Sequence, residues 1–171
     1  MKVRLDLFVA IGAALAGSAC MGDERQQPQV SAGSDIGAGR YLTVVGGCND
    51  CHTAGWNETH GKIPERNRLA GVPVGWQGPW GVTYASNLRL TAASMDEDAW
   101  VRMLRTRKDR PPMPWMNLNQ MAEADSRAIY RYLKSLGPTG GQMPRGLPPG
   151  AAPETPFIPM APPQEPGRAS R

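Results

Sequence analysis

The stretch Cys48-Asn49-Asp50-Cys51-His52 restricts what this chain can fold into more than any other feature of its sequence. Two thiols three residues apart, followed directly by an imidazole, serve three kinds of chemistry: half of a zinc site, a redox-active cysteine pair, or covalent attachment of haem. Each of them requires the two thiols one helical turn apart. The motif alone therefore leaves all three open, and the rest of the chain has to decide.

A structural zinc site needs four Cys or His ligands. Outside the motif the foldable part of the chain offers only His60, no second cysteine pair exists there, and the adjacent side chains of Cys51 and His52 rarely reach one tetrahedral ion. Redox-active cysteine pairs sit in alternating strand–helix patterns, which this sequence does not show. Haem attachment, by contrast, requires that the histidine follow the second cysteine, so the motif favours it.

The first residues predict export. Basic residues precede an apolar run at 7–15, and small residues at 17–19 form a cleavage site, so residues 1–19 are expected to be a signal peptide and the protein to be periplasmic. Cys20 follows the cleavage site, as in bacterial lipoproteins, although Gly17 stands where that signal prefers Leu. An unpaired thiol is a liability in an oxidising compartment, which favours lipidation of Cys20 and membrane attachment over simple cleavage.

Pattern and composition predict short helices and long loops. Residues 20–34 are polar and predict a flexible tether; 35–45 predict a helix, and 54–93, with nine Gly or Pro, a long irregular loop. A capping box of Ser94 with Glu97 predicts the start of a second helix. Residues 122–136 carry the clearest helical period, and Gly137-Pro138 end it.

These elements predict an all-α domain over residues 35–138, with three to four short helices around one covalently bound haem. Residues 139–171 are rich in proline and predict an extended tail. Aromatic residues make up only 6 % of the chain, so the apolar core is thin and a cofactor is expected to supplement it. The formal net charge of +4 is mild, and the basic residues show no nucleic-acid pattern.

A methionine is the expected partner of His52 across the haem. Met113 stands between Pro112 and Pro114, whose rigid backbone lowers the entropy lost when a weak thioether binds. Met116 is its rival in the same loop. His60 is only eight residues beyond His52, which leaves too little chain to pass around a haem edge.

The sequence resembles class I c-type cytochromes, and more narrowly bacterial periplasmic single-haem cytochromes and the haem domains of dehydrogenase cytochrome subunits. The resemblance covers roughly residues 35–138. Its segments are Gly39-Arg40-Tyr41 before CNDCHT, GWQGPWGVTYASNL (75–88), WVRMLRT (100–106), PPMPWMNL (111–118) and RAIYRYLKSLGP (127–138).

The resemblance implies roles for individual residues. Cys48 and Cys51 would attach the haem, while His52 and Met113 would be its axial iron ligands. In the last helix Tyr132 would cross the first helix, where Gly37 would allow close approach. A second set is implied by the loop after the motif: Pro64 would accept the ring N–H of His52, and Trp80, Tyr84 and Asn87 would reach the propionates.

The implied function is one-electron transfer rather than catalysis. Two axial protein ligands leave no open iron position, and thioether ligation favours the ferrous state. Partners would be redox proteins: a dehydrogenase, another cytochrome or a terminal oxidase. Basic residues ahead of the methionine loop would steer an acidic partner: Arg102, Arg105, Arg107, Lys108 and Arg110. The alternatives are an electron-accepting dehydrogenase subunit and a haem peroxidase or sensor.

Overall fold

The computed structural model describes residue 30 and residues 32–162. The expected signal peptide, Cys20 and most of the tether lie outside the described residues. The elements in chain order are α1 (Asp35–Val45), α2 (Cys48–His52), the 3₁₀ turn η2 (Glu65–Asn67), β1 (Val72–Gly78), β2 (Gly81–Ala85), α3 (Leu88–Ala93), α4 (Glu97–Thr106), α5 (Trp115–Leu118), α6 (Glu123–Leu136) and β3 (Phe157–Pro159). Within the described part of the chain no helix combines the length and apolarity needed to cross a bilayer.

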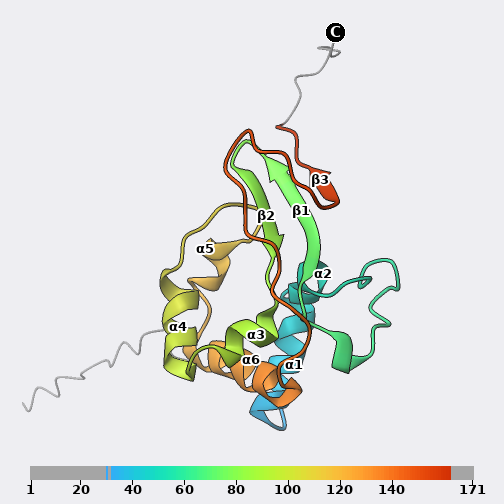
Figure 1. Ribbon diagram of the computed structural model, residues 1–171. Helices are drawn as coiled ribbons and strands as arrows, with labels where there is room; N and C mark the ends of the chain where they lie inside the picture. The colour runs from blue at the N-terminus through green and yellow to red at the C-terminus, as the bar shows by residue number, and fades with distance from the viewer. Residues whose placement is uncertain (1–29, 31, 163–171) are drawn as a thin grey trace, which may run out of the picture.

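The expected all-α fold is wrong, because a three-stranded mixed sheet accompanies the helices. Strand β1 pairs antiparallel with β2 on one side and parallel with β3 on the other, so the order is β2-β1-β3. In Figure 1 the β1–β2 hairpin projects from the helical part of the molecule, and the C-terminal segment runs along it to reach β3. The protein is therefore a helical domain with a β-hairpin extension.

The hairpin lies inside residues 54–93, which the sequence predicted as irregular loop. Its pattern is hidden because the β1 register shifts between Val72 and Gly75, which interrupts the two-residue alternation of a strand. The strands reverse between Gly78 and Gly81, which are paired across the turn. Gly81 has a φ of +98°, a backbone conformation that residues with a Cβ rarely adopt. The glycines at 78 and 81 thus allow the tight turn of this hairpin, although a high glycine content had suggested an irregular loop.

Helices α1 and α6 meet at a glycine, as the sequence suggested, but at a different one. A Cβ on Gly39 would lie 2.0 Å from the carbonyl oxygen of Ala128 and 2.8 Å from the Cβ of Tyr132. The nearest atom to a Cβ on Gly37 belongs to Ser34, within the first turn of α1 itself. The close approach predicted at Gly37 therefore takes place at Gly39.

Aromatic side chains fill the helical core where α4 packs on α6. Trp100 and Tyr130 lie 6.2 Å apart between ring centroids, tilted by 49°. Their polar atoms are satisfied, because Trp100 donates to the carbonyl of Ser126 at 3.1 Å and Tyr130 to that of Met95 at 2.9 Å. The buried residues of α4 are Trp100, Val101 and Leu104.

The predicted capping box at the start of α4 is not formed. Asp96 is the N-cap, and its carboxylate accepts the N–H of Ala99 at 2.7 Å. Ser94 instead ends α3, and its hydroxyl donates to the carbonyl of Thr91.

We expect Asp96→Ala to lower the free energy of unfolding by about 1 kcal/mol, because one N–H of the first turn of α4 loses its acceptor. Ser94→Ala is the matched control and should change stability by less than half as much. Urea unfolding measures both variants. Equal losses of stability for the two variants would contradict Asp96 as the N-cap and support the predicted capping box of Ser94.

The proline-rich tail is part of the fold over its described residues. The N–H of Gly75 donates to the carbonyl of Pro156 at 2.9 Å, and the N–H of Met160 donates to that of Gln77 at 2.7 Å. Phe157 and Ile158 are 44 % and 48 % exposed. Backbone pairing, not side-chain burial, attaches this segment.

Candidate functional site

Helix α2 consists of the motif itself and places both thiols and the imidazole on little more than one turn. Gly47, with a φ of +69°, separates it from α1 and redirects the chain. Cys48 and Cys51 are both unpaired thiols. Burial raises the pKa of Cys48 to about 11 and also raises the pKa of Cys51. Redox-active cysteine pairs need a lowered pKa, so these thiols lack the electrostatics of a dithiol redox centre.

The imidazole of His52 is buried and fixed in one tautomer. Its Nδ1 lies 2.7 Å from the carbonyl oxygen of Ser86, which can only accept, so Nδ1 carries the proton. Burial lowers the pKa of His52, so the ring is neutral and Nε2 keeps its lone pair. This is the state that a histidine needs to bind a metal.

The acceptor of that hydrogen bond differs from the predicted one. Pro64 is exposed, and its carbonyl accepts the N–H of Asn67 at 2.9 Å. Ser86 lies between β2 and α3, 34 residues beyond His52. Every residue type has a backbone carbonyl, so the identity of Ser86 does not mark it as the acceptor. Only a correct prediction of the β1–β2 hairpin would have placed residue 86 beside His52.

A buried hydrogen-bond chain that was not predicted from the sequence holds α2 in place. Asn49, 1 % exposed, donates to the carbonyl of Thr43 at 3.0 Å and accepts from the hydroxyl of Thr53 at 2.8 Å. The Thr53 hydroxyl in turn accepts the N–H of Leu69 at 2.8 Å. Asn49 occupies a variable position of the cysteine motif, yet it joins α1, α2 and the segment before β1.

We expect Asn49→Leu to lower the free energy of unfolding by about 2 kcal/mol, because the buried Thr43 carbonyl loses its side-chain donor and the buried Thr53 hydroxyl proton loses its acceptor. Asp50→Asn is the control in the same helix, since the Asp50 side chain is exposed. Thermal unfolding measures both. A loss for Asn49→Leu no larger than for the control would show that these hydrogen bonds of Asn49 add no stability.

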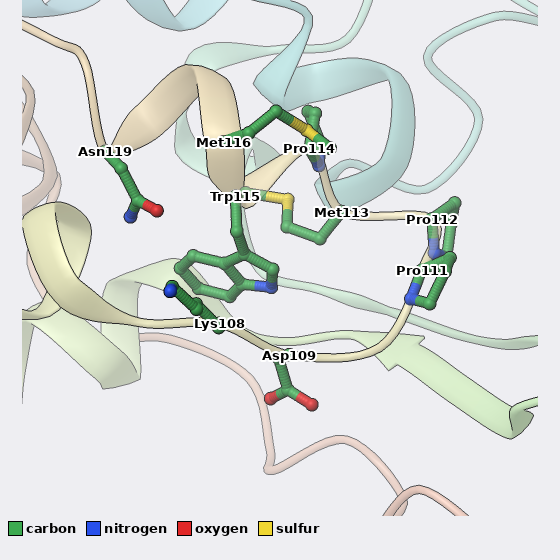
Figure 2. Close-up of a pocket in the computed structure, with 9 residues that line it drawn as sticks. All are labelled: Lys108, Asp109, Pro111, Pro112, Met113, Pro114, Trp115, Met116 and Asn119. Atoms are coloured by element: carbon green, nitrogen blue, oxygen red, sulfur yellow. The ribbon is translucent and has the colours of Figure 1, made fainter.

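Met113 lies in an apolar pocket of about 500 Å³. Figure 2 shows the lining residues, which come from the proline-rich segment and α5: Lys108, Asp109, Pro111, Pro112, Met113, Pro114, Trp115, Met116 and Asn119. Met113 is half-buried, whereas Met116 is 67 % exposed. The residues of α2 do not line this pocket, and in the view of Figure 1 α5 and α2 lie on opposite sides of α3 and the base of the hairpin.

Both ends of the segment that carries Met113 are fastened. On one side the hydroxyl of Thr83 in β2 donates to the carbonyl of Pro111 at 2.6 Å. On the other side the guanidinium of Arg107 lies 4.6 Å from the ring centroid of Trp115. Asn119 donates to the carbonyl of Leu104 at 2.6 Å, which ties α5 to α4. A thioether on this segment is therefore pre-positioned.

Of the three residues expected at the propionates, Trp80 has a buried donor without a partner. Its indole Nε1 is buried and has no hydrogen-bond partner among the described residues. The amide of Asn87 donates to the carbonyls of Thr139 and Gly141, and its oxygen accepts the N–H of Leu90. Tyr84 bonds with Thr155 at 2.8 Å. Asn87 thus caps α3 and binds the tail, and its side chain has no donor left for an anion.

The basic cluster ahead of the methionine loop is partly neutralised. Arg105 pairs with Glu123 at 3.2 Å, and Arg107 pairs with Asp109 at 2.6 Å. The hydrogen bond from Arg107 lowers the pKa of Asp109, so this carboxylate stays charged. The two arginines therefore contribute less to a steering field than their number in the sequence suggested.

The donor set of α2 fits a covalently attached haem better than it fits a zinc ion. Free thiols three residues apart and a neutral imidazole with an available Nε2 are the groups that haem attachment uses. Among residues 30 and 32–162, no three Cys, His, Asp or Glu side chains are grouped to hold a metal ion. Comparison of the chain with protein-family models, curated proteins and solved structures finds no match.

Proposed function

We propose that this protein is a one-electron carrier with a single covalent haem c, attached through Cys48 and Cys51 and ligated by His52 and Met113. The observation that carries the proposal is the neutral tautomer of His52, whose protonated Nδ1 faces Ser86 at 2.7 Å and leaves Nε2 for iron. The haem would supply reversible one-electron chemistry at its iron.

The chain contributes position and a mostly apolar surrounding for the thioether. The bond to Ser86 orients the imidazole, and the Asn49 network fixes α2 against α1. The surface that lines the pocket at Met113 is mainly apolar, and a thioether ligand stabilises the reduced state of the iron. The proposal includes a periplasmic location, membrane attachment through a lipidated Cys20, and a dehydrogenase, cytochrome or oxidase as redox partner.

A haem-stained denaturing gel with an intact-mass measurement tests the attachment. We expect a haem signal that survives denaturation and one haem mass added to the chain. The same mass reports signal cleavage and any lipid. Absence of covalent haem from the exported protein would refute the proposed function.

Met113→Leu tests the second ligand. We expect loss of the methionine–iron charge-transfer band of the oxidised protein, because Leu offers no sulfur, while covalent haem stays. Met116→Leu is the matched control and should keep the band. The opposite pattern would make Met116 the ligand. A high-spin spectrum in the unmutated protein would instead favour a peroxidase or sensor.

A further inference from the structure

The described part of the C-terminal tail is residues 139–162. It contacts the methionine segment, residues 110–118, through one side chain. That side chain is Arg110, which precedes Pro111. Its Nη1 donates to the carbonyl of Leu147 in the tail at 2.6 Å and lies 3.3 Å from the carbonyl of Trp80 in the hairpin turn. One guanidinium therefore joins three segments that are far apart in sequence.

The tail is held at this point by its own hydrogen bonds. Leu147 and Val82 exchange two backbone bonds, with the Val82 N–H donating at 3.0 Å and the Leu147 N–H donating at 2.9 Å. The carbonyl of Leu147 thus accepts from both Val82 and Arg110. Arg110 binds an acceptor that β2 has already fixed in place.

Two glycines make this arrangement possible. A Cβ on Gly81 would lie 2.1 Å from the carbonyl oxygen of Leu147. A Cβ on Gly146 would lie 2.5 Å from Nη2 of Arg110 and 2.9 Å from the carbonyl oxygen of Val82. The tail, the hairpin and the guanidinium are therefore packed at backbone distance, and any side chain at either position would push them apart.

We propose that Arg110 is a positioning residue for Met113, and that the tail sets how firmly the methionine is held. Arg110 and the Thr83–Pro111 bond fasten the start of the segment, two to three residues before Met113. Without Arg110 the segment keeps a single fastening on this side, so Met113 leaves its place more often. The inference rests on the proposed function, because it concerns the ligand of the proposed haem.

The test uses imidazole, which competes with the thioether for the iron of the oxidised holoprotein. Arg110→Ala is expected to increase the apparent affinity for imidazole about tenfold, the size expected for loss of a charge-assisted hydrogen bond. It should also speed amide hydrogen exchange across residues 111–121. Arg102→Ala removes the same charge from an exposed position of α4 and should leave both readouts unchanged.

A second pair of variants changes residues of the tail instead of Arg110. It keeps the inference testable if Arg110→Ala does not fold. Gly146→Ala crowds Arg110 and should shift both readouts in the same direction. Gly141→Ala lies in the same tail with no atom within 4 Å of the added carbon, and should leave them unchanged.

The outcomes separate the two proposals. Imidazole affinity equal to the controls, with covalent haem present, would overturn the inference and leave the proposed function standing. Faster exchange without a change in imidazole affinity would also overturn it, since the segment would then move without releasing the ligand. Absence of covalent haem from the unmutated protein would overturn the proposed function, and the inference with it.

Discussion

The double variant Cys48→Ser, Cys51→Ser is expected to lose covalent haem completely. Serine hydroxyls do not form the thioether bonds that attachment requires, so no haem signal should survive denaturation. The intact mass should then be that of the polypeptide alone, and the thermal midpoint should drop because the proposed haem would be a large bound apolar group that stabilises the folded state. A haem-stained gel and mass spectrometry of the exported protein measure the result.

The remaining cysteine of the chain gives the control. Cys20→Ser leaves α2 intact and should retain one covalent haem per chain, whatever happens to lipid at that position. A haem signal that persists in the double variant would mean that the attachment lies elsewhere.

A methyl group added at Gly39 is expected to cost about 3 kcal/mol of folding free energy. The new carbon would stand 2.0 Å from the carbonyl oxygen and 2.6 Å from the carbonyl carbon of Ala128, which are backbone atoms of α6. Because backbone cannot rotate away as a side chain can, α1 and α6 must separate along their contact. Gly39→Ala should therefore show a much lower urea midpoint.

Gly37→Ala, one half-turn earlier in the same helix, is the control and should act in the opposite direction. Its added carbon would lie 3.3 Å from the Ser34 hydroxyl oxygen and 4.0 Å from the Cβ of Ala32, and both are side-chain atoms. Alanine stabilises a helix over glycine by about 0.5–1 kcal/mol. If Gly39→Ala proved as harmless as Gly37→Ala, the two helices would not be packed as closely as the structure has them.

The helical part of the fold could be predicted because the helices are packed through apolar side chains whose spacing is visible in the sequence. The apolar period of α6 and the buried face of α4 follow from residues such as Trp100, Ile129 and Leu133. The bounds of α1 and the end of α6 at Gly137 also matched the structure.

The sheet could not be predicted in the same way, because its bonds run between backbone atoms. A bulge disrupts the alternation in β1, and β3 presents exposed side chains, so neither strand carries the apolar signal that a buried strand would. For the same reason the sequence pointed to Pro64 as the acceptor from His52, while the structure uses the carbonyl of Ser86.

The candidate site was predicted residue by residue but not as a network. The cysteine motif marks Cys48, Cys51 and His52 by type and spacing alone. The support from Asn49 depends on which backbone groups surround it after folding. The pairing of Arg105 with Glu123 likewise becomes visible only when α4 and α6 are side by side.

The parallel pairing of β3 with β1 also bears on self-association. An unpaired strand edge invites a second molecule to add its own strand, and β3 covers one edge of β1. The backbone groups of Pro156 and Met160, which flank β3, face β1, so those of Phe157 and Pro159 face outward. Proline has no N–H, so only Phe157 of these two residues offers a backbone donor at the new edge. Pro159 therefore makes this edge a poorer template for a strand from a neighbouring chain than an edge with both donors would be.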